Sequence, residues 1–305
     1  MTALHVLLPA LASVNEAPAL RAWLARGDRL PDVRNARDAV VRELFRFAGD
    51  SMPAAAVRHC THADNAETGI WLAADPAYVR SEATGARLMA WPLDDLGSDD
   101  ASQLADALRP LLAGVGVSLS VDTPSTWCLR LSGEAPNAEF VCPVDALGVD
   151  MLECLPRGDA GRTWRRLFNE VQVTLHAHPV NARRVAAGKL PVNALWFWGE
   201  GSLPNPVETS LHAVASGDDV LRGLAKLAGA IRLEPSLAAL QGDCGGGGAL
   251  LLDLVFGVGE SVAEWLPALQ RCLAVSRCDT IMLTFAGGER FRVRPHHRLR
   301  FWRRG

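Results

Sequence analysis

Hydrophobic and polar positions along this chain repeat with two periods, one typical of helices and one typical of strands. Short, largely apolar runs predict buried strands at residues 4–8, 70–74, 87–91, 195–198, 250–256 and 280–285. Apolar positions at helical spacing predict amphipathic helices at residues 15–27, 35–47, 54–60, 98–114, 163–176, 219–227 and 261–275. Because strands alternate with helices, the pattern favours an α/β fold with a largely parallel sheet flanked by helices.

Two neighbouring segments depart from this alternation. Residues 117–121 and 126–131 each alternate with a period of two and are separated by Asp-Thr-Pro-Ser, which predicts a β-hairpin. We expect this hairpin to belong to an element inserted into the core at residues 115–160. The core would then consist of an N-terminal α/β part, residues 1–114, and a C-terminal α/β part, residues 161–305.

The chain of 305 residues is long enough to bury a substantial core without a disulfide or a structural metal. Its seven cysteines are odd in number and irregularly spaced, which indicates reduced thiols in a reducing compartment. The first residues lack a basic segment, and no apolar run approaches the roughly 20 residues of a membrane helix. We therefore expect a soluble, cytoplasmic protein with no membrane partner.

Charge is distributed unevenly, although the net charge is only −3. Residues 290–305 contain seven arginines and no acid, which leaves a net charge of −10 on the rest of the chain. Their alternation with apolar residues predicts a C-terminal hairpin with the guanidinium groups on one face. One hypothesis is a surface that binds anions, nucleic acid or an acidic protein through Arg298, Arg300, Arg303 and Arg304. The alternative is an edge hairpin whose arginines neutralise the acidic body.

The segment 175–204 carries the most informative motif. It contains a proline that ends a helix, two asparagines, a short strand and a Gly-x-Gly turn at the end of that strand. Glycine turns after strands are common places for ligand sites in α/β proteins, because backbone N–H groups become available there. The candidate ligand-binding residues are His178, Asn181, Arg184, Asn193, Gly199 and Gly201. The alternative is a helix–turn–strand connection in which the asparagines satisfy turn backbone.

This motif resembles a segment of the archaeal-type cofactor-independent phosphoglycerate mutases, and we place that resemblance at about residues 115–230. The helix at 218–230, DDVLRGLAKLAGA, is similar to the helix that follows the motif in those mutases. With the WLAADP block at 71–76, the chain as a whole resembles the RpfE-type bacterial regulatory proteins. The resemblance implies an alkaline-phosphatase-like α/β core that holds two divalent metals with Asp and His side chains and uses a Ser or Thr nucleophile.

The chain departs from the mutases where that chemistry would lie. A two-metal site needs several carboxylates and imidazoles at neighbouring strand ends. No acidic cluster follows the first strand, the last third has no motif rich in Asp and His, with His296 and His297 standing in an arginine run, and Trp198 stands where the resemblance implies a basic residue. We therefore expect a non-catalytic regulatory or interaction protein without metal or cofactor, which binds a protein partner or a small anionic ligand. The alternatives are a divergent mutase or phosphatase, and a nucleic-acid-associated factor that uses the C-terminal arginines.

A weaker candidate for metal binding lies near the end of the predicted helix 54–60. His59, Cys60, His62 and Asp64 carry suitable donor atoms, but no second ligand pair follows at the spacing of a zinc motif. The pattern favours a solvated helix end over a metal site.

Overall fold

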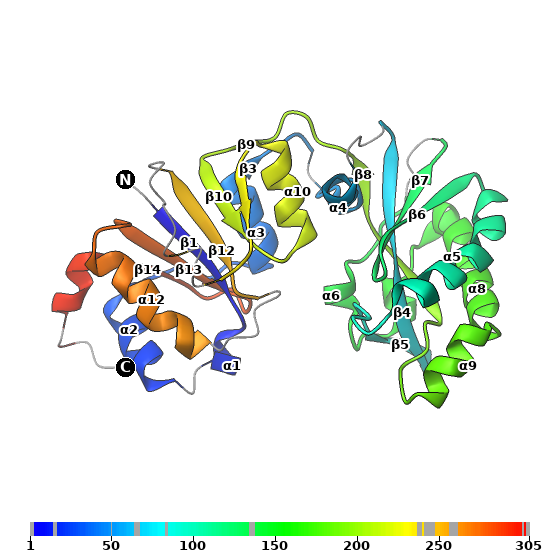
Figure 1. The fold of residues 1–305 in the computed structure, drawn as a ribbon, viewed down its shortest axis with the longest axis horizontal. Coiled ribbons are helices and arrows are strands. Elements are labelled where there is room, and N and C mark those ends of the chain that lie inside the picture. Colours follow the sequence, from blue (N-terminus) through cyan, green and yellow to red (C-terminus); the bar gives the residue numbers. More distant parts are fainter. Residues whose placement is uncertain are drawn as a thin grey trace. The chain divides into compact units, whose positions relative to one another are not determined.

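The fold is described from a computed structural model, which covers residues 3–14, 17–49, 51–63, 68–82, 85–133, 138–236, 240, 248–255, 262–300 and 302. The chain forms two compact units (Figure 1). Unit 1 consists of Met1–Ala48 and Asn205–Gly305, and unit 2 consists of Gly49–Pro204. Unit 1 is therefore built from both ends of the chain, and unit 2 is a continuous segment between them.

Unit 1 contains a seven-stranded sheet with the order β11-β10-β12-β1-β13-β14-β2. Its strands are β1 (Ala3–Leu8), β2 (Asp28–Leu30), β10 (Leu211–Ala215), β11 (Ile231–Leu233), β12 (Ala249–Asp253), β13 (Thr280–Phe285) and β14 (Arg290–Val293). The five strands from β11 to β13 are parallel, whereas β14 is antiparallel to both of its neighbours. The central strands are apolar because helices cover both faces of a largely parallel sheet.

Two layers of helices flank this sheet (Figure 1). One layer, α2 (Pro18–Arg26) and α12 (Val262–Ala274), packs on the face that carries Leu4, Val6 and Leu8 of β1. The other layer consists of α3 (Ala36–Leu44) and α10 (Asp219–Leu227). The remaining elements of unit 1 are α1 (Leu11–Val14), the short strand pair β3 (Phe45–Arg46) and β9 (Glu208–Thr209), and a 3-10 helix at Pro295–Leu299.

Unit 2 is built on an antiparallel sheet in which the long strand β4 is central. The strands are β4 (Ile70–Glu82), β5 (Gly85–Ala90), β6 (Val117–Thr123), β7 (Thr126–Leu131) and β8 (Ala194–Ser202). The first half of β4 pairs with β7 and with β8, and its second half pairs with β5. The pairing of β6 with β7 confirms the predicted hairpin.

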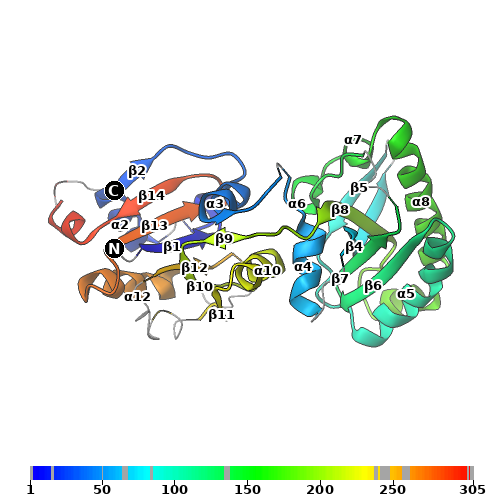
Figure 2. The same cartoon turned by 90° about the horizontal axis from the view of Figure 1, so that it is seen from above.

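Helices cover both faces of the sheet in unit 2. They are α4 (Ala54–His62), α5 (Ser98–Ala113), α6 (Pro143–Ala146), α7 (Met151–Cys154), α8 (Gly158–His176) and α9 (Pro179–Ala186). Figure 2 shows α4 on one face of the sheet and α5 with α8 on the other. The apolar stripe that predicted α5 is buried, since Leu104, Leu108 and Leu112 have no exposed surface. Within the described part of the chain, no helix is long and apolar enough to cross a membrane.

The predicted α/β class with a largely parallel sheet is confirmed by unit 1. The domain boundaries differ from the predicted ones, because residues 49–114 and 161–204 belong to unit 2 together with the hairpin. The physical reason is strand pairing over long sequence separations: β4 bonds both to the hairpin and to β8. Such pairing has no signature in local periodicity.

The basic C-terminal segment agrees with its prediction in part: three of its arginines pair with acids of unit 1, as the alternative expected, but its strand β14 is not an edge strand. β14 forms a hairpin with the preceding strand β13, and the chain then turns into the 3-10 helix. Arg290 contacts Glu43 at 2.5 Å, and Asp28 accepts hydrogen bonds from Arg292 at 3.5 Å and from Arg300 at 2.7 Å. Arg298 is exposed, whereas Arg303 and Arg304 lie outside the described residues. Arg300 is thus paired with Asp28 of the same unit and does not form an exposed basic surface together with Arg298.

Candidate functional site

The two asparagines of the predicted ligand site hold secondary structure together. Asn181 of α9 donates hydrogen bonds from its Nδ2 to the carbonyls of Leu175 and Val192, both at 2.7 Å, and its Oδ1 accepts from the Val192 N–H at 2.8 Å. Asn193 forms the same kind of pair with both backbone groups of Val79, at 2.7 and 2.8 Å. Both asparagines lie in the segment between α8 and β8, and their side-chain amides form hydrogen bonds with backbone groups.

His178 and Arg184 are engaged in the same connection. The Nδ1 of His178 accepts a hydrogen bond from the Val180 N–H at 3.3 Å and so caps α9. The Arg184 side chain is 1% exposed, donates to the Leu190 carbonyl at 2.9 Å and pairs with Asp95 at 2.8 Å. The expectation that Arg184 is available to an anion is therefore corrected: a buried cation needs such partners, and this one has them.

Gly199 and Gly201 lie farther along β8, where the strand approaches the start of α4. Both have positive φ angles, +64° and +153°. A Cβ on Gly199 would lie 2.8 Å from the Cβ of Ala54, and a Cβ on Gly201 would lie 2.5 Å from the Cβ of Pro53. The glycines therefore permit a close approach of strand and helix. The assignment of the other five residues to a ligand stays a prediction.

Glu200 lies between these glycines, and no sequence motif singled it out. Burial without a compensating partner charge raises the pKa of its carboxyl to about 7. A carboxyl that titrates near neutral pH can act as a general acid or base.

We expect Glu200 to titrate near pH 7 in a carboxyl-resolved NMR titration. Its folded-state pKa is raised, so the ionised form destabilises the fold, and stability falls as the pH rises towards and through 7. The variant Glu200→Gln should lack this loss and be more stable than the wild type at pH 8. A Glu200 midpoint in the ordinary carboxyl range would contradict the prediction.

A buried carboxylate organises the core of unit 2. Asp75 of β4 is fully buried and accepts two hydrogen bonds from Arg58 of α4, at 2.9 and 3.0 Å. It also accepts from the indole N–H groups of Trp91 and Trp198, at 3.0 and 2.9 Å, and from the backbone N–H of Trp127 at 3.1 Å. Trp198 therefore has a structural role at the position where the family resemblance implied a basic residue.

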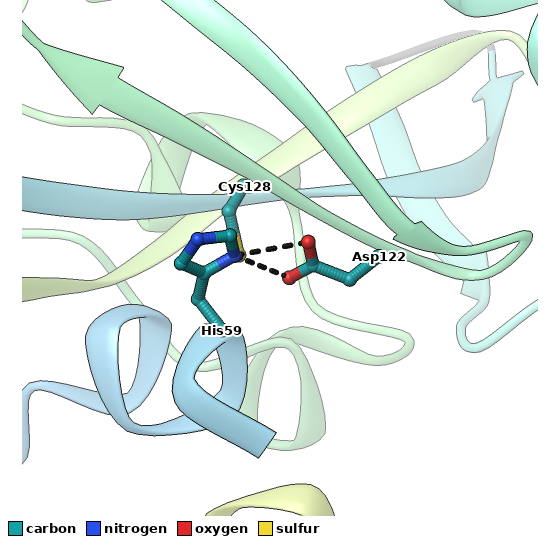
Figure 3. Close-up of side chains that lie close together, drawn as sticks. All are labelled: His59, Asp122 and Cys128. Carbon is teal, nitrogen blue, oxygen red and sulfur yellow. Dashed lines mark hydrogen bonds and ion pairs between the residues drawn. The ribbon is translucent and has the colours of Figure 1, made fainter. Parts of the chain in front are cut away.

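The side chains of His59, Asp122 and Cys128 converge beside this core (Figure 3). They come from α4, β6 and β7. The Nδ1 of His59 lies 2.9 Å from each carboxylate oxygen of Asp122, and its ring stacks on Trp71 at 3.9 Å between centroids. Burial and the nearby charge of Asp122 raise the pKa of the Cys128 thiol well above its usual value.

This cluster is a candidate metal centre. One nitrogen, one carboxylate oxygen and one sulfur lie within 4.8 Å of one another, and it is the one group of three such ligands in the described part of the chain. Imidazole, carboxylate and thiolate together suit a Zn²⁺-type ion, which takes three protein ligands and a further donor. The Cys128 thiol would have to lose its proton on binding.

His59 was one of four metal-binding candidates in the sequence, but its partners in the cluster are not the other three. Asp122 and Cys128 lie more than sixty positions away, on the hairpin that packs against α4. The neighbouring Cys60 donates to the Val57 carbonyl at 3.0 Å, and Asp64 lies outside the described residues. The signal that could have found the cluster was the alternation of the hairpin, since a period of two puts Asp122 on the same face as Ser120, and Ser120 pairs with Cys128.

A second polar cluster lies in unit 1 at the carboxyl ends of the parallel strands, the edge where α/β folds build their sites. Asp253 at the end of β12 is fully buried and accepts from the Ser216 hydroxyl at 2.8 Å and the Val255 N–H at 3.0 Å. Arg37 of α3 lies 3.6 Å from Asp253 and forms an ion pair with Asp218. Burial raises the pKa of Asp253, and Arg37 opposes that shift.

A pair of divalent metals does not fit this edge. The carboxylates of Asp218 and Asp253 share one guanidinium, and Asp218 also caps α10 through the Leu221 N–H at 2.9 Å. Among the described residues, no His/Asp group of three gathers there. Arg37 supplies part of the positive charge that two metals would otherwise supply to Asp218 and Asp253.

In sequence, the chain is similar to one group of enzymes. The chain is 31% identical over 174 residues to a 2,3-bisphosphoglycerate-independent phosphoglycerate mutase of Methanosarcina mazei, which covers 54% of this chain and 44% of the relative. It is 38% identical over 96 residues to a probable mutase of the same type from Geobacter sulfurreducens, covering 29% and 24%. The match thus spans less than half the length of these relatives. No family model matches the chain.

Among solved structures, a cofactor-independent phosphoglycerate mutase from Thermoplasma acidophilum aligns with 95% of this chain and 88% of its own. The TM-score is 0.43 and the identity 17%. The resemblance to cofactor-independent phosphoglycerate mutases that the sequence predicts is confirmed by the relatives in sequence. The chain thus has a phosphoglycerate-mutase-like scaffold.

Proposed function

We propose that the chain is a divergent phosphoglycerate mutase or phosphatase, which acts on small phosphorylated carboxylic acids. The observation that carries the proposal is the 31% identity over 174 residues to proteins named as phosphoglycerate mutases. Identity at that level over more than half of the chain supports common descent of the scaffold. It supports the substrate class less directly, because less than half of each relative is matched.

The metal requirement of this proposal differs from that of a two-metal site. The described residues support one ion, held by His59, Asp122 and Cys128 in unit 2. An ion at this place would act as a Lewis acid if its remaining coordination position is open to substrate, and as a structural ion if it is closed. All three side chains have little exposed surface, which favours the structural role.

A second candidate function is a non-catalytic regulatory or interaction protein on the same scaffold, in line with the RpfE-type resemblance. The observation that favours it is Arg37. A guanidinium between Asp218 and Asp253 stabilises the strand edge by charge neutralisation but occupies the surroundings of both carboxylates. A chain that has replaced catalytic cations with an internal one can keep its fold and a binding role.

We expect purified protein to bind about one equivalent of Zn²⁺, because three protein ligands converge on one point. The variants Cys128→Ala and His59→Ala should lose it, as measured by elemental analysis after dialysis. Cys60→Ala is the matched control, since it removes a buried thiol from the same helix without touching the cluster. Zinc content that is unchanged in Cys128→Ala would contradict the metal assignment.

The two candidate functions separate in one assay. Interconversion of 2- and 3-phosphoglycerate, or release of phosphate from them, is measured with the wild type in excess Mn²⁺, Mg²⁺ or Zn²⁺. Turnover that falls in Cys128→Ala but not in Cys60→Ala supports the enzyme and assigns its metal. Folded, zinc-loaded protein without turnover under any of these conditions contradicts the enzyme and leaves the interaction protein.

A further inference from the structure

A basic cavity lies in unit 1, on the side of the sheet covered by α2 and α12. Its volume is about 230 Å³, and it opens between the ends of these helices and the segment that joins β14 to the 3-10 helix. Trp23 and Arg26 come from α2, Leu273 comes from α12, and Arg294 and Arg298 come from the C-terminal segment. All of these residues belong to unit 1.

The cavity is lined by three arginines and by no carboxylate among the described residues. The Nε atoms of Arg26 and Arg294 are buried and have no hydrogen-bond partner in the described structure. A buried donor without a partner is costly, and the cost is greatest when the group is charged. An anion in the cavity would supply a counter-charge to both guanidinium groups.

Asp28 of β2 pairs with other arginines of the C-terminal segment. Asp28 accepts from Arg300 at 2.7 Å and from Arg292 at 3.5 Å, and neither of these two lines the cavity. Asp28 also lies 3.5 Å from the Nε2 of His297. The other ring nitrogen of His297 accepts from the Arg294 N–H at 3.3 Å, which fixes the start of the 3-10 helix beside the cavity. Among the described residues, no carboxylate pairs with the three arginines that line the cavity, so their charge is available to a ligand.

The rest of the wall is apolar. Trp23, Leu273, Val293 and Pro295 face the same space as the guanidinium groups. A tryptophan beside arginines suits a flat, apolar group attached to an anion, since the indole packs on the flat group while the guanidinium groups bind the charge. Guanidinium forks match phosphate oxygens in pairs, and several arginines favour a dianion over a monoanion.

We propose that this cavity binds a small organic phosphate that carries a planar apolar group. The site is independent of the proposed function. It lies beyond Val293, which pairs with Ile281 near the start of β13, whereas Asp253 lies at the opposite end of the parallel strands. Of the arginines in the predicted anion surface, the structure places Arg298 here and directs Arg300 to Asp28.

The test is isothermal titration of the full chain with phenyl phosphate as the probe. Saturable binding is expected, and Arg294→Gln and Arg26→Gln should each weaken it about tenfold or more, which is the effect of losing one charge-assisted hydrogen bond. Arg298→Gln removes an exposed arginine, so it still tests the proposal if the half-buried Arg26 and Arg294 are needed for folding. The matched control is Arg271→Gln, an exposed arginine of α12 that does not line the cavity.

Two further probes decide the ligand class. Inorganic phosphate should bind more weakly than phenyl phosphate. Trp23→Leu should remove that difference, because the indole contributes only to the binding of the phenyl ring. Benzoate should bind more weakly still, since it is a monoanion. No saturable binding of phenyl phosphate, binding unaffected by all three pocket substitutions, or benzoate bound as tightly as phenyl phosphate would each overturn the proposal.

Discussion

The variant Asp75→Ala is expected to destabilise unit 2 by about 3–5 kcal/mol, because it leaves the buried guanidinium of Arg58 without its counter-charge. The Arg58 side chain is 7% exposed, so water cannot replace the carboxylate. The indole N–H groups of Trp91 and Trp198 and the backbone N–H of Trp127 would lose their acceptor as well. Each unsatisfied buried donor adds to the loss.

Chemical denaturation followed by tryptophan fluorescence measures this effect, since six of the nine tryptophans lie in unit 2. Asp75→Asn should lie between the wild type and Asp75→Ala, because the amide oxygen still accepts hydrogen bonds but the charge is lost. The matched control is Asp159→Ala, which breaks an ion pair with Arg162 on the surface, where the side chains are 94% and 76% exposed. An Asp75→Ala variant as stable as this control would show that the network contributes little to folding.

The second large effect is expected in unit 1. The variant Arg37→Met should lose about 2 kcal/mol at pH 7, because the ionised carboxylate of the fully buried Asp253 then has no nearby cation. Burial already raises the pKa of Asp253, and removal of Arg37 raises it further. A carboxyl with a raised folded-state pKa costs stability when it ionises, so the penalty grows as the pH rises through that pKa.

The loss in Arg37→Met should therefore shrink as the pH is lowered from 7 towards the ordinary range of a carboxyl group. The free energy of unfolding is compared with that of the wild type at pH 7 and at pH 5. Arg29→Met is the control, since Arg29 pairs with Asp32 on the surface of the same unit. An equal loss at both pH values would mean that Arg37 acts through packing and not through the charge of Asp253.

Local pattern determined most of the individual elements. The helix predicted at 219–227 has the observed bounds, and the hairpin at 117–131 and the strand at 280–285 form where the alternation and the apolar run placed them. These features depend on the neighbours of each residue along the chain. Asp218 caps the helix that follows it, and a strand covered on both faces is a continuous apolar run. The family resemblance was visible for a similar reason, since motifs such as His-Pro-Val-Asn are contiguous.

The tertiary structure decided the partners of the polar groups. His59 meets Asp122 and Cys128, Asp75 gathers donors from four separate segments, and the cavity arginines lie on α2 and beyond β14. Hydrophobic periodicity reports which face of an element is buried, but it carries no information about which distant element covers that face. The chemistry of this protein depends on those long-range contacts, and so the sequence by itself named His59, Asn181 and Arg298 without showing what each of them contacts.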